Sequence, residues 1–140
     1  VGYDVMKRVA SDENRHHLFY RDLSSDALAV DPSGMVIAIE RQVREFEMPG
    51  TGIVDFETHA RAIAKAGIYD FQIHHAQILV PVVLRHWDVE NVSGLNDEAE
   101  RARDALLTRI DRIGKAGRRL LRRRAEAEQR QVPERVPEPV

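Results

Sequence analysis

The fold of this chain follows from the stretch Ser11-Asp12-Glu13-Asn14-Arg15-His16-His17, which lies inside a long helical pattern near the start of the sequence. One face of that pattern repeats with gaps that alternate between three and four residues, at Met6, Val9, Glu13, His16, Tyr20, Leu23 and Ala27. This spacing is typical of one buried helix face. Glu13 and His16 therefore occupy two positions of an otherwise apolar seam.

The chemistry of Glu13 and His16 indicates a metal ligand pair. A carboxylate and an imidazole on a buried stripe are costly unless they are paired or bound to a metal. Their i, i+3 spacing directs both side chains to one spot beside the helix. A Glu-x-x-His helix that faces a bundle core is the half-site of a carboxylate-bridged di-iron or di-manganese centre. A buried ion pair without metal is the competing interpretation.

Length and composition limit the class of protein. The chain has 140 residues, is 43% hydrophobic and 31% charged, and carries a net charge of −2, which does not favour nucleic acid as a partner. It has no cysteine, so any metal must be held by oxygen and nitrogen ligands. The longest apolar run, residues 78–84, is far shorter than the roughly 20 residues of a membrane span.

The remaining pattern predicts an all-α protein. We expect helices at about residues 3–29, 32–47, 55–66 and 70–87, and a fifth that begins after Asn96. Asp31, Asp55, Asp70 and Asn96 are the expected N-caps, and Gly67 suits the end of the third helix. Pro81 should kink the fourth helix, whose apolar residues predict a central position. The fifth helix, with one narrow apolar stripe (Ala102, Leu106, Ile110, Ile113 and Leu120), should lie on the outside.

Several stretches together resemble one enzyme family. They are, in order, residues 10–16, 30–34, 48–49, 66–70, 84–89 and 93–95, followed by the helix that carries Arg118 and Arg119. In this order they resemble the C-terminal half of the acyl-acyl-carrier-protein desaturases, the soluble di-iron family that includes the plant stearoyl-type enzymes and actinobacterial relatives. The chain starts with Val1 inside a helical pattern, so we expect it to be a fragment whose N-terminal part is missing.

The resemblance implies a ferritin-like di-iron helical bundle, of which residues 1–131 are the C-terminal half. Residues 132–140 contain three prolines and are expected to form a disordered tail. It implies an oxidoreductase of fatty acid biosynthesis that puts a cis double bond into a saturated acyl thioester, using two iron ions, dioxygen and a ferredoxin-like electron donor. Its partners would be acyl carrier protein and, in a homodimer, a second copy. The expected location is the cytoplasm, without a membrane span.

The resemblance also assigns roles to individual residues. Glu13 matches a bridging carboxylate and His16 a terminal ligand of one iron. Asp12 matches an acid behind the metal that hydrogen-bonds an iron-ligating histidine of the family's other motif. The family's first Glu-x-x-His motif and two further carboxylate ligands have no counterpart here. This fragment alone is therefore expected to be inactive.

A basic run on the fifth helix has two interpretations. Arg118, Arg119, Arg122 and Arg123 form either a contact surface for the acidic acyl carrier protein or a solvated helix end whose charge suits the helix dipole. The other histidines, His59, His74, His75 and His86, are expected to be solvated or hydrogen-bonded rather than metal ligands.

Two further hypotheses compete with the desaturase. One keeps the ferritin-like scaffold but assigns a different di-iron oxidase or N-oxygenase chemistry. The other is a metal-free helical interaction module. If the chain is a fragment, Glu13 and His16 should face a side of the first helix that the chain itself leaves uncovered.

Overall fold

The computed structural model describes residues 2–48 and 50–131, and every regular element among them is helical. The all-α prediction is therefore confirmed. The elements are α1 (Gly2–Val30), α2 (Pro32–Glu45), α3 (Phe56–Lys65), α4 (Phe71–His74), the π-helix η1 (His75–His86), the short 3-10 helix η2 (Val89–Asn91) and α5 (Asp97–Gln131). The expected tail at residues 132–140 lies outside the described residues.

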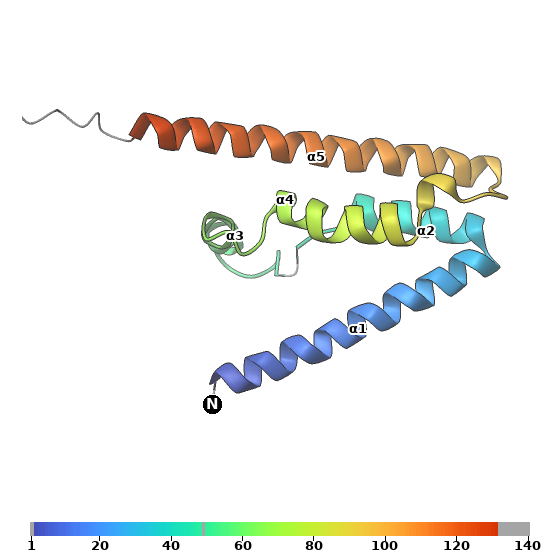
Figure 1. Ribbon diagram of the computed structural model, residues 1–140, viewed down its shortest axis with the longest axis horizontal. Helices are drawn as coiled ribbons and strands as arrows, with labels where there is room; N and C mark the ends of the chain where they lie inside the picture. The colour runs from blue at the N-terminus through green and yellow to red at the C-terminus, as the bar shows by residue number, and fades with distance from the viewer. Residues whose placement is uncertain (1, 49, 132–140) are drawn as a thin grey trace, which may run out of the picture.

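α5 packs against both α2 and η1, and these three helices supply most of the core (Figure 1). α2 makes its most extensive contacts with α5, and α1 leaves α2 and diverges from the other helices toward its N-terminus (Figure 1). The buried side chains of the core come from five elements and are Leu28, Val36, Ile39, Leu79, Val83, Val89, Ala99, Leu106 and Ile110. None of the helices among the described residues is long and apolar enough to cross a membrane.

Most of the expected helix caps are confirmed. Asp31 accepts a hydrogen bond from the backbone N–H of Gly34 at 2.9 Å, and Asn96 accepts one from Ala99 at 2.9 Å. Asp70 accepts one from the N–H of Ile73 at 2.9 Å. Gly67 has the positive φ of 70° that suits a glycine after a helix.

The cap at Asp55 differs from the prediction. Asp55 has a left-handed φ of 60°, and its side chain makes no capping hydrogen bond. Its backbone carbonyl accepts hydrogen bonds from the N–H groups of Thr58 and His59 instead. Asp55 is thus the residue at the start of α3, as predicted, but its side chain does not cap the helix.

The fourth predicted helix is two elements. A single turn of α-helix, α4, continues directly into η1, which contains Pro81. Proline lacks the N–H of a regular helical bond and crowds the preceding turn, and the wider π-helix register relieves that crowding. The register is visible at the end of the segment, where the N–H of Trp87 donates to the carbonyl of Val82, five residues back.

The fifth helix is more central than its charge pattern predicts. Leu106 and Ile110 of α5 are almost completely buried against the other helices. Buried glycines allow α4 and η1 to approach closely, because a methyl group at Gly114 would lie 2.6 Å from Nε2 of His75. One at Gly117 would overlap the side chain of Gln72. The apolar stripe ends early, since Leu120 is 40% exposed.

Candidate functional site

The predicted ligand pair lies on the N-terminal half of α1, where the helix diverges from the core (Figure 1). Nδ1 of His16 is 3.8 Å from Oε2 of Glu13, so the i, i+3 spacing brings the two side chains together as expected. Both are strongly exposed, with 67% of the His16 side chain and 74% of the Glu13 side chain accessible. The structure therefore presents an oxygen and a nitrogen donor side by side on an open helix face.

The seam is uncovered over most of its length. We define the α1 seam as Met6, Val9, Glu13, His16, Tyr20, Leu23 and Ala27. Met6, Val9, Tyr20 and Leu23 are between 46% and 66% exposed, whereas Ala27, near the core, is half-buried. The expectation that this chain does not fully cover the face that carries Glu13 and His16 is confirmed. Part of the predicted fourth helix is open as well, since Phe71 is 79% exposed.

Asp12 takes part in a local ion pair. Its Oδ1 accepts a hydrogen bond from Nη1 of Arg15 at 3.1 Å, and both side chains are exposed. Asp12, the predicted partner of a metal-ligating histidine, thus lies next to Glu13 in the sequence but forms an ion pair with Arg15. Within the described residues, no three histidine or acidic side chains gather closely enough to hold a metal ion.

The predicted carrier-protein surface is exposed. Arg118, Arg119, Arg122 and Arg123 all lie on the solvent side of α5. None of the ion pairs found in the described part of the chain involves these four arginines. Their charge is therefore available to an anionic partner.

A polar cluster that the sequence pattern did not reveal fastens α1 to η1. Nε2 of His86 lies 3.3 Å from Oγ of Ser25 and 3.4 Å from Oδ1 of Asp22. Both contacts converge on one ring nitrogen, whereas a proton relay needs the serine and the acid on opposite nitrogens. The indole N–H of Trp87 donates to the carbonyl of Arg21 at 3.0 Å. The cluster is therefore a structural clamp.

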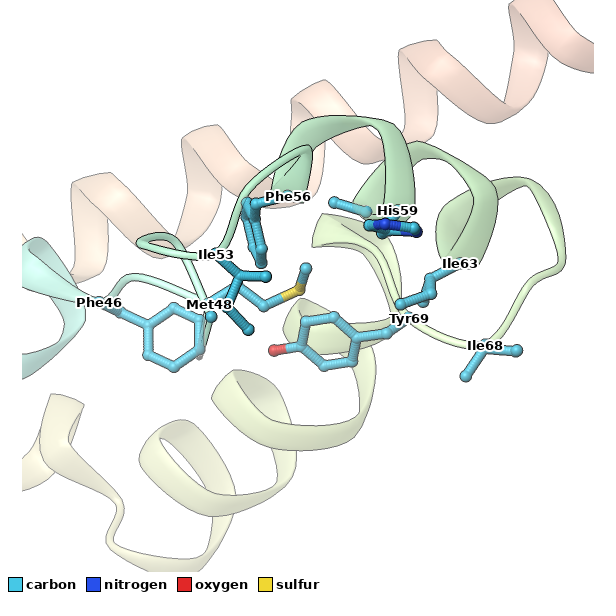
Figure 2. A pocket seen from close by; sticks show the side chains of 10 residues that line it. Phe46, Met48, Ile53, Phe56, His59, Ile63, Ile68 and Tyr69 are labelled. Atoms are coloured by element: carbon cyan, nitrogen blue, oxygen red, sulfur yellow. The ribbon is translucent and has the colours of Figure 1, made fainter.

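Two apolar cavities flank the end of α2. The larger, about 710 Å³, lies between the end of α2, α3 and the segments that join them, and Figure 2 shows its side chains. It is lined by Phe46, Met48, Gly50, Ile53, Phe56, His59, Ala60, Ile63, Ile68 and Tyr69. The second, about 330 Å³, lies between α2 and η1 and has Trp87 in its wall. The apolar residues after the break at residues 48–52 were the available signal for the larger one.

His74 lines the second cavity and contacts two residues that line the larger one. Its ring stacks on Phe46, with centroids 4.5 Å apart, and its Nδ1 is 2.7 Å from the hydroxyl of Tyr69. Burial, followed by the charge of neighbouring His75, lowers the pKa of His74 below its ordinary value of 6.5. Burial also raises the pKa of Tyr69. The expectation that His74 is a hydrogen-bonded histidine is confirmed.

The lowered pKa of His74 predicts acid sensitivity. The unfolded chain binds a proton at this imidazole more readily than the folded chain does, so the stability that His74 contributes is present above pH 6.5 and is lost as the pH falls through the lower folded pKa. We expect the urea midpoint to fall less between pH 8 and pH 5 in His74→Gln than in the wild type. His59→Gln, at an exposed position of α3, is the control and should keep the wild-type dependence.

Comparison with known proteins places these features in a family. The family model described as fatty acid desaturase matches residues 3–136. DesA1 of Mycobacterium tuberculosis, which carries the name of an acyl-[acyl-carrier-protein] desaturase, is 32% identical over 106 residues, or 76% of this chain. The chloroplastic stearoyl-[acyl-carrier-protein] 9-desaturases of Simmondsia chinensis and Solanum commersonii are each 32% identical, over 79% and 88% of this chain.

The matched region covers only 29% to 31% of the length of these three relatives. No solved structure matches the chain. The all-helical arrangement agrees with the ferritin-like helical bundle of the matched family. With a family model that covers nearly the whole chain and relatives above 30% identity, this chain belongs to the fatty acid desaturase family.

Proposed function

We propose that this chain supplies one helix of ligands to the di-iron centre of an acyl-acyl-carrier-protein desaturase. The observation that carries the proposal is the pairing of Glu13 and His16 at 3.8 Å on an open apolar seam, inside the region that matches the family. The enzyme would put a cis double bond into a saturated acyl chain with dioxygen and a reduced ferredoxin-type donor. It would act as a cytoplasmic homodimer in fatty acid biosynthesis.

The donor set of Glu13 and His16 fits iron in type but not in number. Carboxylate oxygen and imidazole nitrogen are suitable ligands for iron and manganese. A complete site of this kind takes six such side chains from four helices. The proposal therefore assigns the other ligands to a segment outside this sequence. When bound, the two metal ions would supply the activation of dioxygen.

Within that proposal, residues of this chain hold the metal and orient another of its ligands. The carboxylate of Glu13 and the imidazole of His16 would be the two side chains of this chain that hold the metal. Asp12, released from Arg15, accepts a hydrogen bond from a histidine of the opposing motif and fixes the orientation of its ring. This role requires Arg15 to turn away, which its exposed position permits.

The cavities and the basic helix support the proposed substrate. Walls of aliphatic and aromatic side chains, such as those at Val82 and Trp87, exclude water and suit an alkyl chain. Arg118, Arg119, Arg122 and Arg123 give α5 a positive surface for the acidic carrier protein that delivers the chain.

The test uses the natural protein that contains this chain, expressed in a bacterial host. We expect bound iron and new unsaturated acyl chains. Glu13→Ala should lower the unsaturated product by about 100-fold or more, since even changes behind a metal ligand cost 10–100-fold. Glu57→Ala, which affects only an exposed glutamate near Arg61 on α3, should keep full product.

The outcomes separate the competing functions. A protein that binds no iron with Glu13 and His16 intact would overturn both di-iron interpretations. A protein that binds iron but adds no unsaturated chains would overturn the desaturase and leave a di-iron oxidase of another substrate.

A further inference from the structure

A groove between η1 and α5 is separate from the two cavities described above. Its volume is about 280 Å³, and Val80 and Leu84 form part of its η1 wall. The second cavity is lined instead by Ile78 and Val82 of η1. Residues two positions apart lie on nearly opposite sides of a helix. The groove therefore occupies the side of η1 away from the second cavity, and the acyl chain of the proposed function does not need it.

One end of the groove brings two nitrogen donors to the same place. A methyl group at Gly114 of α5 would lie 2.6 Å from Nε2 of His75 and 3.2 Å from Nη1 of Arg118. Nitrogens from two helices thus converge above a glycine that has no side chain. Within the described part of the chain, neither nitrogen has a hydrogen-bond or ion-pair partner. Two neighbouring N–H donors without a partner suit an anionic oxygen ligand.

A third polar group beside this end also lacks a partner. Oε1 of Gln72 is buried and accepts no hydrogen bond from the residues that the structure describes. Gln72 precedes His75 by about one helical turn and packs over Gly117, which follows Gly114 by about one turn. A buried amide group that makes no hydrogen bond is costly, and rotation of the amide presents either its oxygen or its N–H groups. A polar ligand at this end can supply the missing bond.

The rest of the groove is apolar and leads to an acid. Leu107 and Ile110 of α5 line the wall opposite η1, and Leu107 lies about 10 Å along the helix from the polar end, at 1.5 Å per residue. Glu90 of η2 also borders the groove and is exposed. The carbonyl of Val92, just after η2, accepts a hydrogen bond from Arg103 of α5. Glu90 therefore belongs to the Leu107 end of the groove.

We propose that this groove binds a free medium-chain fatty carboxylate, with its carboxylate at His75 and Arg118 and its alkyl chain directed toward Glu90. A carboxylate accepts strong charge-assisted hydrogen bonds from a guanidinium, and aliphatic walls suit an alkyl chain. Glu90 repels a carboxylate at the far end, so the ligand binds in one orientation. Asp111, the other acid of the groove, is paired with Lys115 at 2.5 Å. The inference does not depend on the metal ligands of the proposed function.

Isothermal titration calorimetry of the 140-residue chain with sodium octanoate tests the proposal. We expect one octanoate to bind in the groove about 10-fold or more tightly than octanol, which has the same alkyl chain but no charge to pair with the donors. Acetate has the charge but no alkyl chain to bury, so it should also bind about 10-fold or more weakly than octanoate.

Matched variants locate the ligand. Arg118→Gln and His75→Leu should each weaken octanoate binding by about 10-fold or more, because each removes one of the two donors. Arg112→Gln removes an exposed arginine of α5 that does not line the groove, and His59→Leu changes a histidine of the larger cavity. Both should keep the wild-type affinity. Circular dichroism checks that all four variants retain the helical content of the wild type.

Each contrary result overturns the proposal in its own way. Octanol that binds as tightly as octanoate would show that the donors do not recognise the carboxylate. Equal losses in Arg118→Gln and Arg112→Gln would reduce the effect to general attraction by positive charge. Binding that is lost in His59→Leu but kept in His75→Leu would place the ligand in the larger cavity. Wild-type chain that binds no octanoate would refute the site outright.

Discussion

Replacement of Leu106 by alanine is expected to lower the free energy of unfolding by about 2–5 kcal/mol. Leu106 is completely buried in the core that α2, η1 and α5 share. The truncation removes apolar contacts and leaves a cavity that a close-packed interior fills only in part. Urea denaturation followed by the fluorescence of Trp87, the single tryptophan, measures the change.

Leu121→Ala is the matched control for this prediction. Leu121 lies on the same helix but is 46% exposed, so the same truncation should change the free energy of unfolding by less than about 1 kcal/mol. Equal effects at Leu106 and Leu121 would contradict the central position of α5.

Trp87→Ala is expected to loosen α1 from the core. The change removes the hydrogen bond to the carbonyl of Arg21 and the partly buried indole, at a cost of about 2–3 kcal/mol, below the 3–5 kcal/mol of a fully buried tryptophan. Amide hydrogen exchange should become faster in the C-terminal third of α1, near Arg21 and Ser25, with a smaller effect in α5.

Trp87→Phe separates the two contributions. Phenylalanine keeps most of the apolar contact but cannot donate the hydrogen bond, so we expect a loss of about 1 kcal/mol. If the exchange rates of α1 stay unchanged in both variants, the clamp between α1 and η1 does not hold the helix, and the packing of Leu28 alone does.

The helices could be predicted because their signals are local. The predicted first helix, residues 3–29, and the observed Gly2–Val30 differ by one residue at each end. Asp31 and Asn96 cap the helices that they were expected to cap, because a capping carboxylate or amide acts within three residues of itself. The positive φ of Asp55 could not be predicted from residue type, because residues other than glycine rarely adopt it.

Contacts between helices were harder to predict. The burial of α5 depends on Gly114 and Gly117, which permit close approach only because His75 and Gln72 face them across the interface. No spacing rule within one helix reveals such a partner. The π-helical register around Pro81 was missed for a related reason, since a proline signals disruption but not the form that the disruption takes.

The candidate site could be predicted only in its local part. Glu13 and His16 are neighbours on one helix, so their spacing alone placed them together, and the structure agrees at 3.8 Å. The clamp at His86 joins residues about sixty positions apart, and no pattern in the sequence signalled it.

The contacts of Trp87 and His86 anchor α1 near its C-terminal end, so a small tilt at this anchor moves the N-terminal half of the helix by a larger distance. The helix is anchored near Arg21 and Ser25, and Glu13 lies about 12 Å farther along it than Arg21, at 1.5 Å per residue. A tilt of about 10° at the anchor therefore moves Glu13 by about 2 Å, several times the roughly 0.5 Å tolerance of a metal site. A partner that covers the α1 seam must therefore also prevent this tilt of α1. Under the proposed function, metal affinity would therefore depend on the stiffness of this anchor, which contains none of the proposed ligands.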